Sequence, residues 1–437
     1  MSARLCVVGA GRSGAVTAAC LADLGHSVRA VDVDAARVAM LQGGRAPFYE
    51  PGLDELIRRN LDAACLSFTT AFADALPGAG FILLSVDTPS RSNGEADLSS
   101  LSAAVRQLAP LLPKDALVIT RSTVPVGTNT WLAEAILAEN PQAAFEVVSN
   151  PEFLREGHAV DDFMQPERIV IGARTPAAAQ AVARLYDRVA SPIVFTDLAT
   201  AELIKYAANA FLATSVSFIN EIANICERVG ADISVVSQAL ALDRRVGPHA
   251  YLAAGIGFGG SCLPKDLRAL ITTAEQHDYT PPLLKAVVET NELQPRRVIS
   301  LLREIFSDLS ALTVGVLGIS FKGDTFDARN SPALAVIRLL AEEGARVRAH
   351  DPLADGTAQE QIGALARLCS DAYAAAEGCH ALIIATNHSS FLELDLERLG
   401  RAMASRVLID GRNLFDPELA TRAGFAYVGI GRPRRGE

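Results

Sequence analysis

The sequence lacks closely spaced pairs of cysteines. Its seven cysteines stand at positions 6, 20, 65, 226, 262, 369 and 379, without a CxxC pair or the spacing of a disulfide framework. An odd, scattered set of cysteines is typical of reduced thiols in a reducing compartment. The pattern therefore excludes a disulfide-stapled scaffold and predicts a cytoplasmic protein.

Basic charge and long apolar runs are also scarce. The chain has 40 basic against 50 acidic residues, a formal net charge of -10, which argues against a nucleic-acid-binding surface. The apolar N-terminal segment LCVVGAGRSGAVTAACLADLG admits a signal peptide, but its glycines and the charged continuation RAVDVD fit strand, turn, helix and strand better. No stretch reaches the roughly 18 consecutive apolar residues of a membrane span. We therefore predict neither a nucleic-acid partner nor a membrane partner, and no motif predicts a metal site.

The 437 residues, half of them apolar, exceed one ordinary core and predict several domains. Strand-like runs with helical patterns between them occur in the first and last thirds of the chain. They lie at 4–8, 27–32, 81–86, 117–120, 145–150, 168–173, 311–321, 381–386 and 406–411. This alternation is typical of α/β folds with helices on both faces of a parallel sheet.

The middle of the chain has a helical pattern. The segment AELIKYAANAFLATSVSFINEIANICERVG predicts one long helix that ends at Gly230, and further helix extends to about residue 304. A second strand–helix–strand pattern follows, with its helix beginning near Pro332 and its second strand in ARVRAHDP, residues 345–352. We predict an α/β protein with two Rossmann-like doubly wound domains, residues 1–196 and 305–437, joined by a long central helix and a helical middle domain, residues 197–304.

A glycine motif lies at the first strand-to-helix turn. Gly9-x-Gly11-x-x-Gly14 precedes the helix, and Asp32 ends the next strand. Small residues permit a tight turn and close approach of a pyrophosphate to the helix N-terminus, and the aspartate accepts hydrogen bonds from both ribose hydroxyls. A carboxylate there repels a 2′-phosphate, so NAD is favoured over NADP. Arg37 either lines the adenosine side or is a solvated helix arginine.

The segment GFGGSCLPKD, residues 257–266, places a thiol beside charged groups. Pro264 suits the first turn of a helix, so Cys262 is predicted just ahead of a helix N-terminus, where the dipole favours a thiolate, and Lys265 adds positive charge. A buried structural cysteine is the alternative. NAD together with a reactive cysteine indicates oxidation of an aldehyde to an acid, because a thiolate adduct expels a hydride and leaves a thioester that water hydrolyses.

Lys205 and Asn209 lie four residues apart on the long helix and therefore share a face. Two interpretations are open: an interior hydrogen-bonded pair, or donors to an oxyanion.

The segment NPEFLREG, residues 150–157, predicts a capped helical turn with Glu152 and Glu156 on one face. These acids are either ordinary first-turn residues favoured by the helix dipole or carboxylates that act on a water molecule. Thr123 in RSTVPVGT ends a strand and is placed to hold that water.

In these motifs the chain resembles the UDP-glucose/GDP-mannose dehydrogenase family over about residues 4 to 430. The resemblance rests on the order GAGRSG with Asp32, FYEPGLDEL, DTPS, RSTVPVGT, NPEFLREG, AELIKYAANAFLAT, GFGGSCLPKD and GISFKGDTFDARNSP. It implies NAD-dependent, two-step, four-electron oxidation of a nucleotide sugar at C6 to a uronic acid. The segments LDRRVGPHAYLAAGIGFGG and FYEPGLDELIRRN are more similar to the UDP-glucose branch, so UDP-glucose is the expected substrate and GDP-mannose the alternative.

The resemblance also implies roles by position. The implied catalytic residues are the nucleophile Cys262, the oxyanion donors Lys205 and Asn209, of which Lys205 is also a candidate base, and the water-handling groups Glu152, Asp266 and Thr123. The implied NAD contacts are Gly9, Gly11, Gly14, Asp32, Arg37, Thr88, Thr123, Glu156, Lys265 and Arg329. The implied UDP-sugar contacts are Glu152, Phe153, Leu154, Arg155, Glu156, Lys205, Asn209, Tyr251, Leu252, Gly255, Gly259, Phe321, Lys322 and Arg412, with Arg245 reaching the substrate across a homodimer interface built by the central helix.

Some residues depart from the family pattern. Arg12 and Ser13 stand where the family usually has Tyr and Val, and Asp87 stands where Gly or Asn is usual. Arg121 replaces a common lysine, and Asn330 stands where an acid is frequent. None of these removes a catalytic group, so we expect an effect on NAD affinity rather than on the reaction.

Two rival interpretations predict different behaviour. A two-electron hydroxyacid dehydrogenase also has a Rossmann domain and a Lys-x-x-x-Asn helix, but it has no use for Cys262 or for a second nucleotide domain. A catalytically inactive NAD-binding or assembly protein has no need for the combination of cysteine, lysine, asparagine and glutamate.

Overall fold

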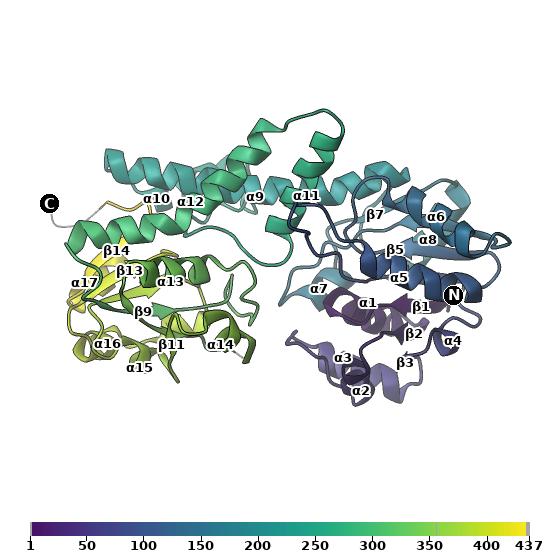
Figure 1. Cartoon of the computed structure of the whole chain (residues 1–437), viewed down its shortest axis with the longest axis horizontal. Helices are drawn as coiled ribbons and strands as arrows, with labels where there is room; N and C mark the ends of the chain where they lie inside the picture. The colour runs from purple at the N-terminus through teal and green to yellow at the C-terminus, as the bar shows by residue number, and fades with distance from the viewer. Residues whose placement is uncertain (1, 355, 434–437) are drawn as a thin grey trace. The chain divides into compact units, whose positions relative to one another are not determined.

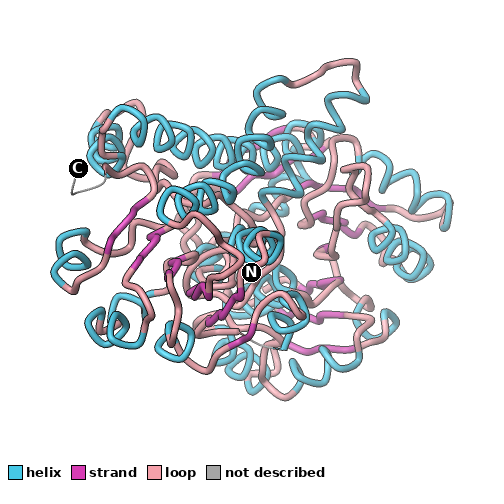
Figure 2. The backbone as a smooth tube through the Cα atoms, turned by 60° about the vertical axis from the view of Figure 1, so that its left-hand side comes forward, coloured by secondary structure: helices cyan, strands magenta, loops and turns pink. Residues whose placement is uncertain are grey.

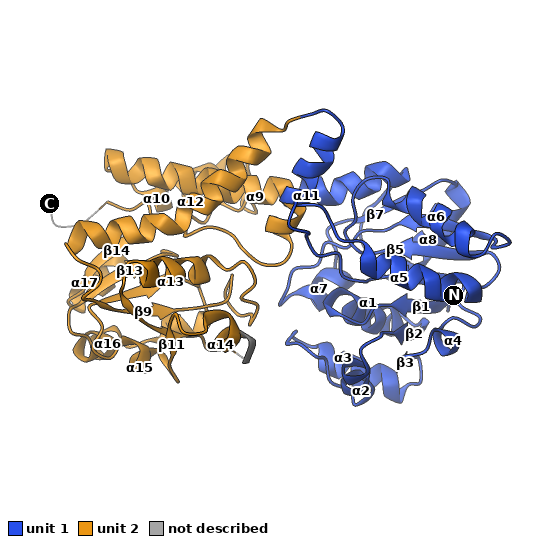
Figure 3. Ribbon diagram, viewed as in Figure 1, with its two compact units in different colours: residues 1–208, 268–279 blue, residues 209–267, 280–437 orange. Residues whose placement is uncertain are grey.

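The computed structural model describes residues 2–354 and 356–433. The chain divides into two compact units, shown in blue and orange in Figure 3. Unit 1 comprises residues 1–208 and 268–279, and unit 2 comprises residues 209–267 and 280–437. Two helices, α9 (Leu198–Val229) and α11 (Leu263–Gln276), contribute residues to both units. Within the described part of the chain no helix has the length and apolarity needed to cross a membrane.

Unit 1 is built on an eight-stranded sheet in the order β3-β2-β1-β4-β5-β6-β7-β8 (Figure 1). All neighbouring strands are parallel except β6 and β7. The strands are β1 (Arg4–Val8), β2 (Ser27–Val31), β3 (Leu66–Thr69), β4 (Phe81–Leu84), β5 (Ala116–Thr120), β6 (Phe145–Ser149), β7 (Ile169–Ala173) and β8 (Ile193–Thr196). The helices are α1 (Arg12–Asp23), α2 (Ala35–Gln42), α3 (Leu53–Asp62), α4 (Phe72–Ala75), α5 (Ser99–Leu108), α6 (Thr128–Glu139), α7 (Ala159–Met164) and α8 (Pro176–Ala183), with 3-10 turns at η1 (Ala109–Leu111) and η2 (Arg184–Tyr186).

Strand β1 shows why this sheet is buried on both faces. Leu5 and Val7 belong to an apolar cluster with α1, α3 and α8, whereas Cys6 and Val8 belong to a second cluster with α5 and α6. Alternate side chains of a strand point to opposite faces, so a strand covered on both sides is apolar throughout. The continuous apolar run that begins the sequence is therefore a central strand.

Unit 2 is built on a six-stranded parallel sheet in the order β11-β10-β9-β12-β13-β14. Its strands are β9 (Thr313–Leu317), β10 (Arg346–His350), β11 (Arg367–Leu368), β12 (Ala381–Ile384), β13 (Val407–Asp410) and β14 (Ala426–Gly429). Its helices include α10 (Ile233–Leu242), α12 (Pro282–Ile305), α13 (Pro332–Glu342), α14 (Gly356–Ile362), α15 (Ala372–Ala376), α16 (Leu396–Ala402) and α17 (Pro417–Arg422), with a 3-10 turn at η3 (Ser389–Glu393). Figure 2 shows the strands in magenta and the helices in cyan. Apolar clusters cover both faces of this sheet as well, and the predicted fold class is confirmed.

The long central helix is confirmed as α9, and Gly230 follows it with a left-handed φ of 74°. Glycine adopts that conformation without steric cost, so it ends the helix where the sequence predicts. The strands β3, β8, β11 and β14 did not emerge from the sequence. They are short strands near or at the edges of the sheets, where the hydrophobic signal is weakest.

The predicted helical turn over residues 150–157 is wrong, because helix α7 begins only at Ala159. The carboxylate of Glu50 accepts the amides of Gly157 and Ala159 at 2.8 and 2.7 Å. The side chain of Asn150 accepts from Arg121 at 2.9 Å instead of capping a helix. Side chains that bond to these groups compete with helical hydrogen bonding and hold this segment as a loop.

Each sheet has a topological switch point, at which the strand order reverses. In unit 1 this point lies between β1 and β4, and in unit 2 between β9 and β12. Helical crossovers leave on opposite sides there, which opens a crevice at the carboxyl ends of the two strands. Ligands of doubly wound folds bind in such crevices, so each unit offers one binding edge.

Candidate functional site

The glycine loop lies at the crevice of unit 1, between β1 and α1. Gly9 has a φ of 91°, and a Cβ on it would lie 2.6 Å from the carbonyl oxygen of Ser85. A Cβ on Gly14 would lie 1.9 Å from the carbonyl oxygen of Gly9, so neither position accepts a side chain. A Cβ on Gly11 would meet no described atom within 4 Å. The backbone at Gly11 is therefore open to a ligand in front of α1, which fits a dinucleotide pyrophosphate.

Asp32 follows β2 at the same edge of the sheet. Its carboxylate accepts the amide of Ala10 at 2.6 Å, and the Nη1 atom of Arg37 lies 2.9 and 3.0 Å from its two oxygens. Arg37 is therefore an ion-pair partner of Asp32 and not a solvated helix arginine. The amide of Ala10 fixes the carboxylate beside the glycine loop, where the ribose of a dinucleotide lies in this fold.

Arg12 is the first residue of α1 and forms an ion pair with Glu156. This pair brings Glu156 to the glycine loop, although 143 residues lie between the two positions in the sequence. The positive charge that replaces the usual tyrosine is therefore compensated within unit 1.

Thr88, Thr123 and Glu152 follow three neighbouring strands, β4, β5 and β6. The hydroxyl of Thr88 donates to the carbonyl oxygen of Thr123 at 2.7 Å. The carboxylate of Glu152 accepts the amide of Leu154 at 2.6 Å. The carboxyl ends of parallel strands meet at one edge, so the three candidates lie along the same edge of the sheet, and Thr88 and Thr123 are in direct contact.

The side chains that follow Glu152 have specific partners in unit 1. The ring of Phe153 lies 4.0 Å from the guanidinium carbon of Arg168 and 5.1 Å from the ammonium of Lys205. Arg155 forms an ion pair with Asp162 at 2.6 Å. Leu154 packs against the core of the unit. Of these predicted substrate contacts, Phe153 stands next to a predicted catalytic group.

Lys205 lies on α9 and is only 5% exposed. Within the described residues, its ammonium makes no ion pair and no hydrogen bond, and its one contact of this kind is the ring of Phe153. Burial of most of this side chain limits the access of water to its ammonium, so an acceptor there is favourable. Lys205 is therefore a candidate donor to an oxygen atom of a ligand.

Cys262 immediately precedes α11, and its carbonyl oxygen accepts the amide of Asp266 at 2.8 Å. Cys262 is thus the N-cap residue of α11. Its side chain is exposed, so the alternative of a buried structural cysteine is wrong. The helix N-terminus favours a negative charge at this position.

The carboxylate of Asp266 is buried and joins two other candidates. It accepts from the amide nitrogen of Asn209 at 2.5 Å and from the ammonium of Lys265 at 2.6 Å. Asp266 therefore orients Asn209. The hydrogen bond of Asn209 goes to Asp266 and not to Lys205, so it does not support an interior pair of Lys205 and Asn209. An amide nitrogen has two hydrogens, so the second remains for another acceptor.

The glycine-rich segment that precedes Cys262 is clamped by side-chain amides. Asn220 accepts the amide of Gly255 at 2.8 Å, and Gln294 donates to the carbonyl oxygen of Gly255 at 2.8 Å. Asn291 accepts the amide of Phe258 at 2.8 Å. These three clamping residues were not recognised in the sequence. Polar amides on the apolar faces of two long helices were the available signal.

Gly259 and Gly260 permit close packing against the segment that follows β9. A Cβ on Gly259 would lie 2.3 Å from the carbonyl oxygen of Asn330, and the amide of Gly260 donates to the carbonyl oxygen of Arg329 at 2.9 Å. The guanidinium of Arg329 itself pairs with Asp327 at 2.6 Å. The cysteine loop and the residues around Arg329 therefore form one structure within unit 2.

Arg412 follows β13, at the carboxyl edge of the sheet in unit 2. Its guanidinium donates to the carbonyl oxygens of Ala385, Phe321 and Gly257 at 2.9, 3.3 and 3.4 Å. Within the described residues it has no carboxylate partner, and burial lowers the pKa of Arg412 to about 10. The site therefore has an uncompensated positive charge beside Phe321, and Lys322 is the next residue.

The remaining predicted substrate contacts are more dispersed. Arg245 pairs with Asp243 at 2.6 Å and its side chain is 88% exposed. Tyr251 is also exposed, whereas Leu252 packs against the core of unit 2. Arg245 does not join the other site residues of its own unit.

Three sequence models of one dehydrogenase family match the chain in order. They are the NAD-binding domain at residues 3–190, the central domain at residues 199–293 and the UDP-binding domain at residues 315–417. The chain therefore belongs to the UDP-glucose/GDP-mannose dehydrogenase family, and NAD is its cofactor.

Individual relatives are similar over almost their full lengths. The chain is 42% identical to UDP-glucose 6-dehydrogenase TuaD of Bacillus subtilis, covering 98% of this chain and 93% of that one. It is 43% identical to UDP-glucose 6-dehydrogenase of Pseudomonas aeruginosa, covering 99% and 98%. The solved UDP-glucose dehydrogenase from Pyrobaculum islandicum matches with a TM-score of 0.93 at 39% identity over 99% of this chain and 98% of that one. GDP-mannose dehydrogenase from Pseudomonas aeruginosa matches with a TM-score of 0.55 at 29% identity over 98% and 99%.

Proposed function

We propose that this chain oxidises UDP-glucose at C6 to UDP-glucuronate in two NAD-dependent steps. The observation that carries the proposal is the exposed Cys262 at the N-cap of α11, beside the Asp266 node that holds Asn209 and Lys265. In the oxidation of an alcohol, a nucleophilic thiol becomes useful at the step that carries the aldehyde on to an acid. Relatives named UDP-glucose 6-dehydrogenase, at 42% and 43% identity, support the substrate.

When bound, NAD accepts one hydride in each of the two oxidations. The first oxidation converts the C6 alcohol to an aldehyde, and Lys205 in its neutral amine form takes the hydroxyl proton and so becomes the ammonium that donates in the later steps. The thiolate of Cys262 then adds to the aldehyde carbon and forms a thiohemiacetal. Loss of the second hydride from that carbon leaves a thioester, and attack by water breaks the carbon–sulfur bond, releasing the carboxylate and restoring the thiol.

The groups around the sulfur stabilise charge and direct water. Lys205 and the second amide hydrogen of Asn209 donate to the oxygen that becomes negative when the thiolate or water adds. Glu152, Thr123 and Asp266 position or activate the water that hydrolyses the thioester. The hydrogen bond from Asn209 to Asp266 supports this assignment because it orients the amide before substrate arrives.

The proposed NAD contacts include the groups at the crevice of unit 1. The glycine loop faces the pyrophosphate, and Asp32 with Arg37 lies at the adenosine ribose. The other proposed contacts are Thr88, Thr123, Glu156, Lys265 and Arg329. The open backbone at Gly11 and the fixed carboxylate of Asp32 support this part of the proposal.

The proposed UDP-sugar contacts include the groups at the crevice of unit 2. The guanidinium of Arg412 is positively charged and has no carboxylate partner among the described residues. A diphosphate provides the matching negative charge. Lys322 adds a second positive charge. The other proposed contacts are residues 152–156, Lys205, Asn209, Tyr251, Leu252, Gly255, Gly259 and Phe321.

We also propose a functional division of the chain at the predicted boundaries. Residues 1–196 bind NAD, residues 197–304 carry the cysteine loop and the dimer helix, and residues 305–437 bind the UDP-sugar. The order of the three matching family domains supports this division. None of the seven cysteines forms a disulfide in the described chain, which supports a reducing, cytoplasmic location.

The proposal predicts two NADH for each UDP-glucose consumed. The measurement is the absorbance of NADH at limiting UDP-glucose, with the sugar product identified by mass spectrometry. One NADH per sugar would support a two-electron dehydrogenase and contradict the proposal. GDP-mannose and UDP-N-acetyl sugars serve as comparison substrates, and faster turnover of GDP-mannose would favour the alternative substrate.

The chain is proposed to act as a homodimer through α9. Phe211, Phe218 and Ile225 are spaced seven residues apart and are 68%, 48% and 48% exposed. Residues at this spacing lie on one side of a helix and form an apolar stripe. A second copy of the chain covers such a stripe by twofold symmetry, and the exposed Arg245 reaches the partner's substrate.

Charged residues in this stripe are expected to produce monomers. The double variant Phe211→Glu and Phe218→Glu places two like charges in the proposed interface, so sedimentation should show the mass of a single chain. Leu419→Glu, at an exposed leucine of α17, is the control and should remain dimeric. A double variant that sediments as the wild type does would contradict this interface.

A further inference from the structure

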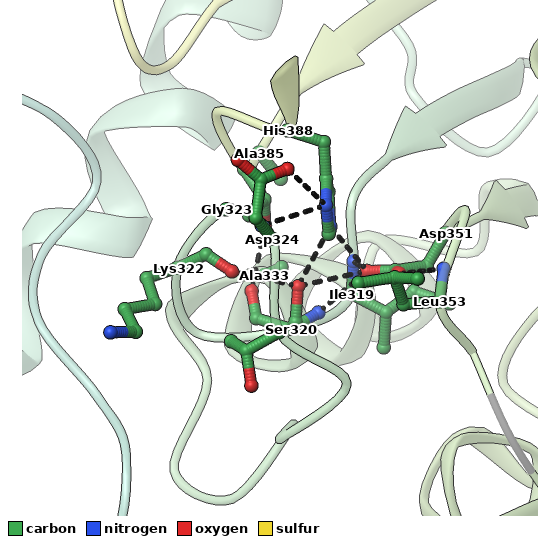
Figure 4. Close-up of polar contacts among 12 residues, drawn as sticks. Ile319, Ser320, Lys322, Gly323, Asp324, Ala333, Asp351, Leu353, Ala385 and His388 are labelled. Atoms are coloured by element: carbon green, nitrogen blue, oxygen red, sulfur yellow. Dashed lines mark hydrogen bonds and ion pairs between the residues drawn. The ribbon is translucent and has the colours of Figure 1, made fainter. Parts of the chain in front are cut away.

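A buried polar cluster lies at the crevice of unit 2 and was not recognised in the sequence. Ser320 follows β9, Asp351 follows β10, and His388 follows β12, so the three residues come from three neighbouring strands. All three are buried, and Figure 4 shows their side chains turned toward one another. The segment that they surround is the loop with Phe321 and Lys322.

The hydrogen bonds of His388 determine its tautomer. The amide of Asp324 donates to Nδ1 at 3.1 Å, so Nδ1 is an acceptor and the ring proton lies on Nε2. From Nε2 that proton is shared between the hydroxyl of Ser320 at 2.9 Å and the carboxylate of Asp351 at 3.0 Å. The imidazole therefore connects the loop after β9 with the end of β10.

One carboxylate oxygen of Asp351 accepts several donors. The same carboxylate oxygen accepts the amides of Ile319 and Ser320 at 2.7 and 2.9 Å, besides the proton from His388. Burial raises the pKa of Asp351, but the hydrogen bonds from His388 and the two amides outweigh burial and hold it below the ordinary value of an aspartate. The hydroxyl of Ser320 has two acceptors at 3.0 Å, the carbonyl oxygen of Lys322 and the crowded carboxylate oxygen of Asp351.

The loop is held on both sides of Gly323. The cluster bonds to the carbonyl group of Lys322 on one side and to the amide of Asp324 on the other. A Cβ on Gly323 would lie 2.2 Å from the carbonyl oxygen of Asn387. Asp324 has a φ of 57°, in the left-handed region that is unfavourable for most residues. The loop therefore keeps an unfavourable conformation because the surrounding bonds require it.

This conformation determines where the ligand-facing groups lie. Figure 4 shows the side chain of Lys322 extending away from the cluster. The carbonyl oxygen of Phe321 accepts from Arg412. The loop thus places one positive charge directly and supports a second through Arg412.

We propose that His388, together with Asp351 and Ser320, is a positioning device that places Lys322 and Arg412 for the diphosphate of the nucleotide sugar. This inference rests on the proposed function, because the diphosphate belongs to the UDP-sugar. None of the three residues touches the reacting carbon. Their loss therefore weakens binding of the nucleotide and leaves the chemical step intact.

Variants at His388 separate the two contacts of its ring. In His388→Gln the amide nitrogen replaces Nε2 as donor, and the acceptor for Asp324 is lost. In His388→Asn the amide oxygen replaces Nδ1 as acceptor, and the donor for Asp351 is lost. His388→Ala loses both contacts.

Calorimetry with UDP on the full-length protein measures the effect directly. Loss of one buried hydrogen-bond partner is expected to raise the Kd for UDP about tenfold, and His388→Ala more. The KM for UDP-glucose should rise in parallel, with kcat and the Kd for NAD unchanged. A merely structural role would lower thermal stability without this selective change.

A matched control lies at the opposite edge of the same sheet. His380 accepts the amide of Thr313 through Nδ1 at 3.1 Å, at the amino end of β9. His380→Gln removes a comparable backbone contact and should leave the Kd for UDP unchanged. An unchanged Kd for UDP in His388→Gln and His388→Asn, or an equal rise in His380→Gln, would overturn the inference. A wild-type protein that fails to oxidise UDP-glucose would instead contradict the proposed function.

Discussion

Replacing Cys262 with alanine is expected to abolish formation of UDP-glucuronate while the affinity for NAD stays unchanged. The variant retains the N-terminus of α11, the Asp266 node and the glycine loop, but no atom remains that can add to the aldehyde. Removal of a covalent nucleophile lowers kcat by about a thousandfold or more. The measurements are NADH production, mass spectrometry of the sugar product, and NAD binding by calorimetry.

Controls distinguish loss of the nucleophile from loss of the fold. Cys262→Ser retains a hydroxyl at the same N-cap, but a hydroxyl is far less ionised than a thiol at neutral pH, so its turnover should also be strongly reduced. Cys369→Ser changes a cysteine of unit 2 outside the proposed site and should keep wild-type turnover. Wild-type turnover in Cys262→Ala would refute the nucleophilic role.

Replacing Lys205 with methionine is expected to lower kcat by about a hundredfold to a thousandfold. Methionine keeps an unbranched apolar stem next to the ring of Phe153, 5.1 Å from the present ammonium, so packing changes little. The substitution removes a hydrogen-bond donor that has no acceptor among the described residues of the protein. That donor is needed most when an oxyanion forms. The measurement is steady-state kinetics with saturating NAD and UDP-glucose.

The pattern of kinetic change is the decisive part of this second prediction. A group that acts in the transition state lowers kcat and kcat/KM together, whereas a group that only binds substrate raises KM. Lys114→Met, at a lysine in the loop before β5, is the matched control and should behave as the wild type does. An unchanged kcat in Lys205→Met would remove this residue from the catalytic set.

Local patterns were sufficient for the parts of the protein that depend on neighbouring residues. The glycine motif predicted the turn after β1, because Gly9 and Gly14 exclude a side chain through atoms of the turn itself and the adjacent strand. Gly230 predicted the end of α9 because glycine adopts the left-handed φ of 74° there without steric cost. The position of Cys262 ahead of α11 also followed from the proline and charges within a few residues.

Contacts between distant segments were not accessible in this way. The turn over residues 150–157 satisfies helix-capping rules, but Glu50, more than a hundred positions earlier, takes its amides. Likewise, Asn209 carries no local sign of its hydrogen bond to Asp266, at a separation of 57 positions. Such partners depend on how strands and helices pack.

The sequence by itself determined the features from which the chemistry is proposed: a dinucleotide loop with its aspartate, a cysteine at a helix N-terminus, and the helix that carries Lys205 and Asn209. These features follow from residue type and from spacing along one element. Only the tertiary structure decided which groups hold them in place, among them Asp266 and the cluster around His388. The physical reason is that a buried donor or acceptor takes whichever partner packing brings within hydrogen-bonding distance, and that partner is usually far away in the sequence.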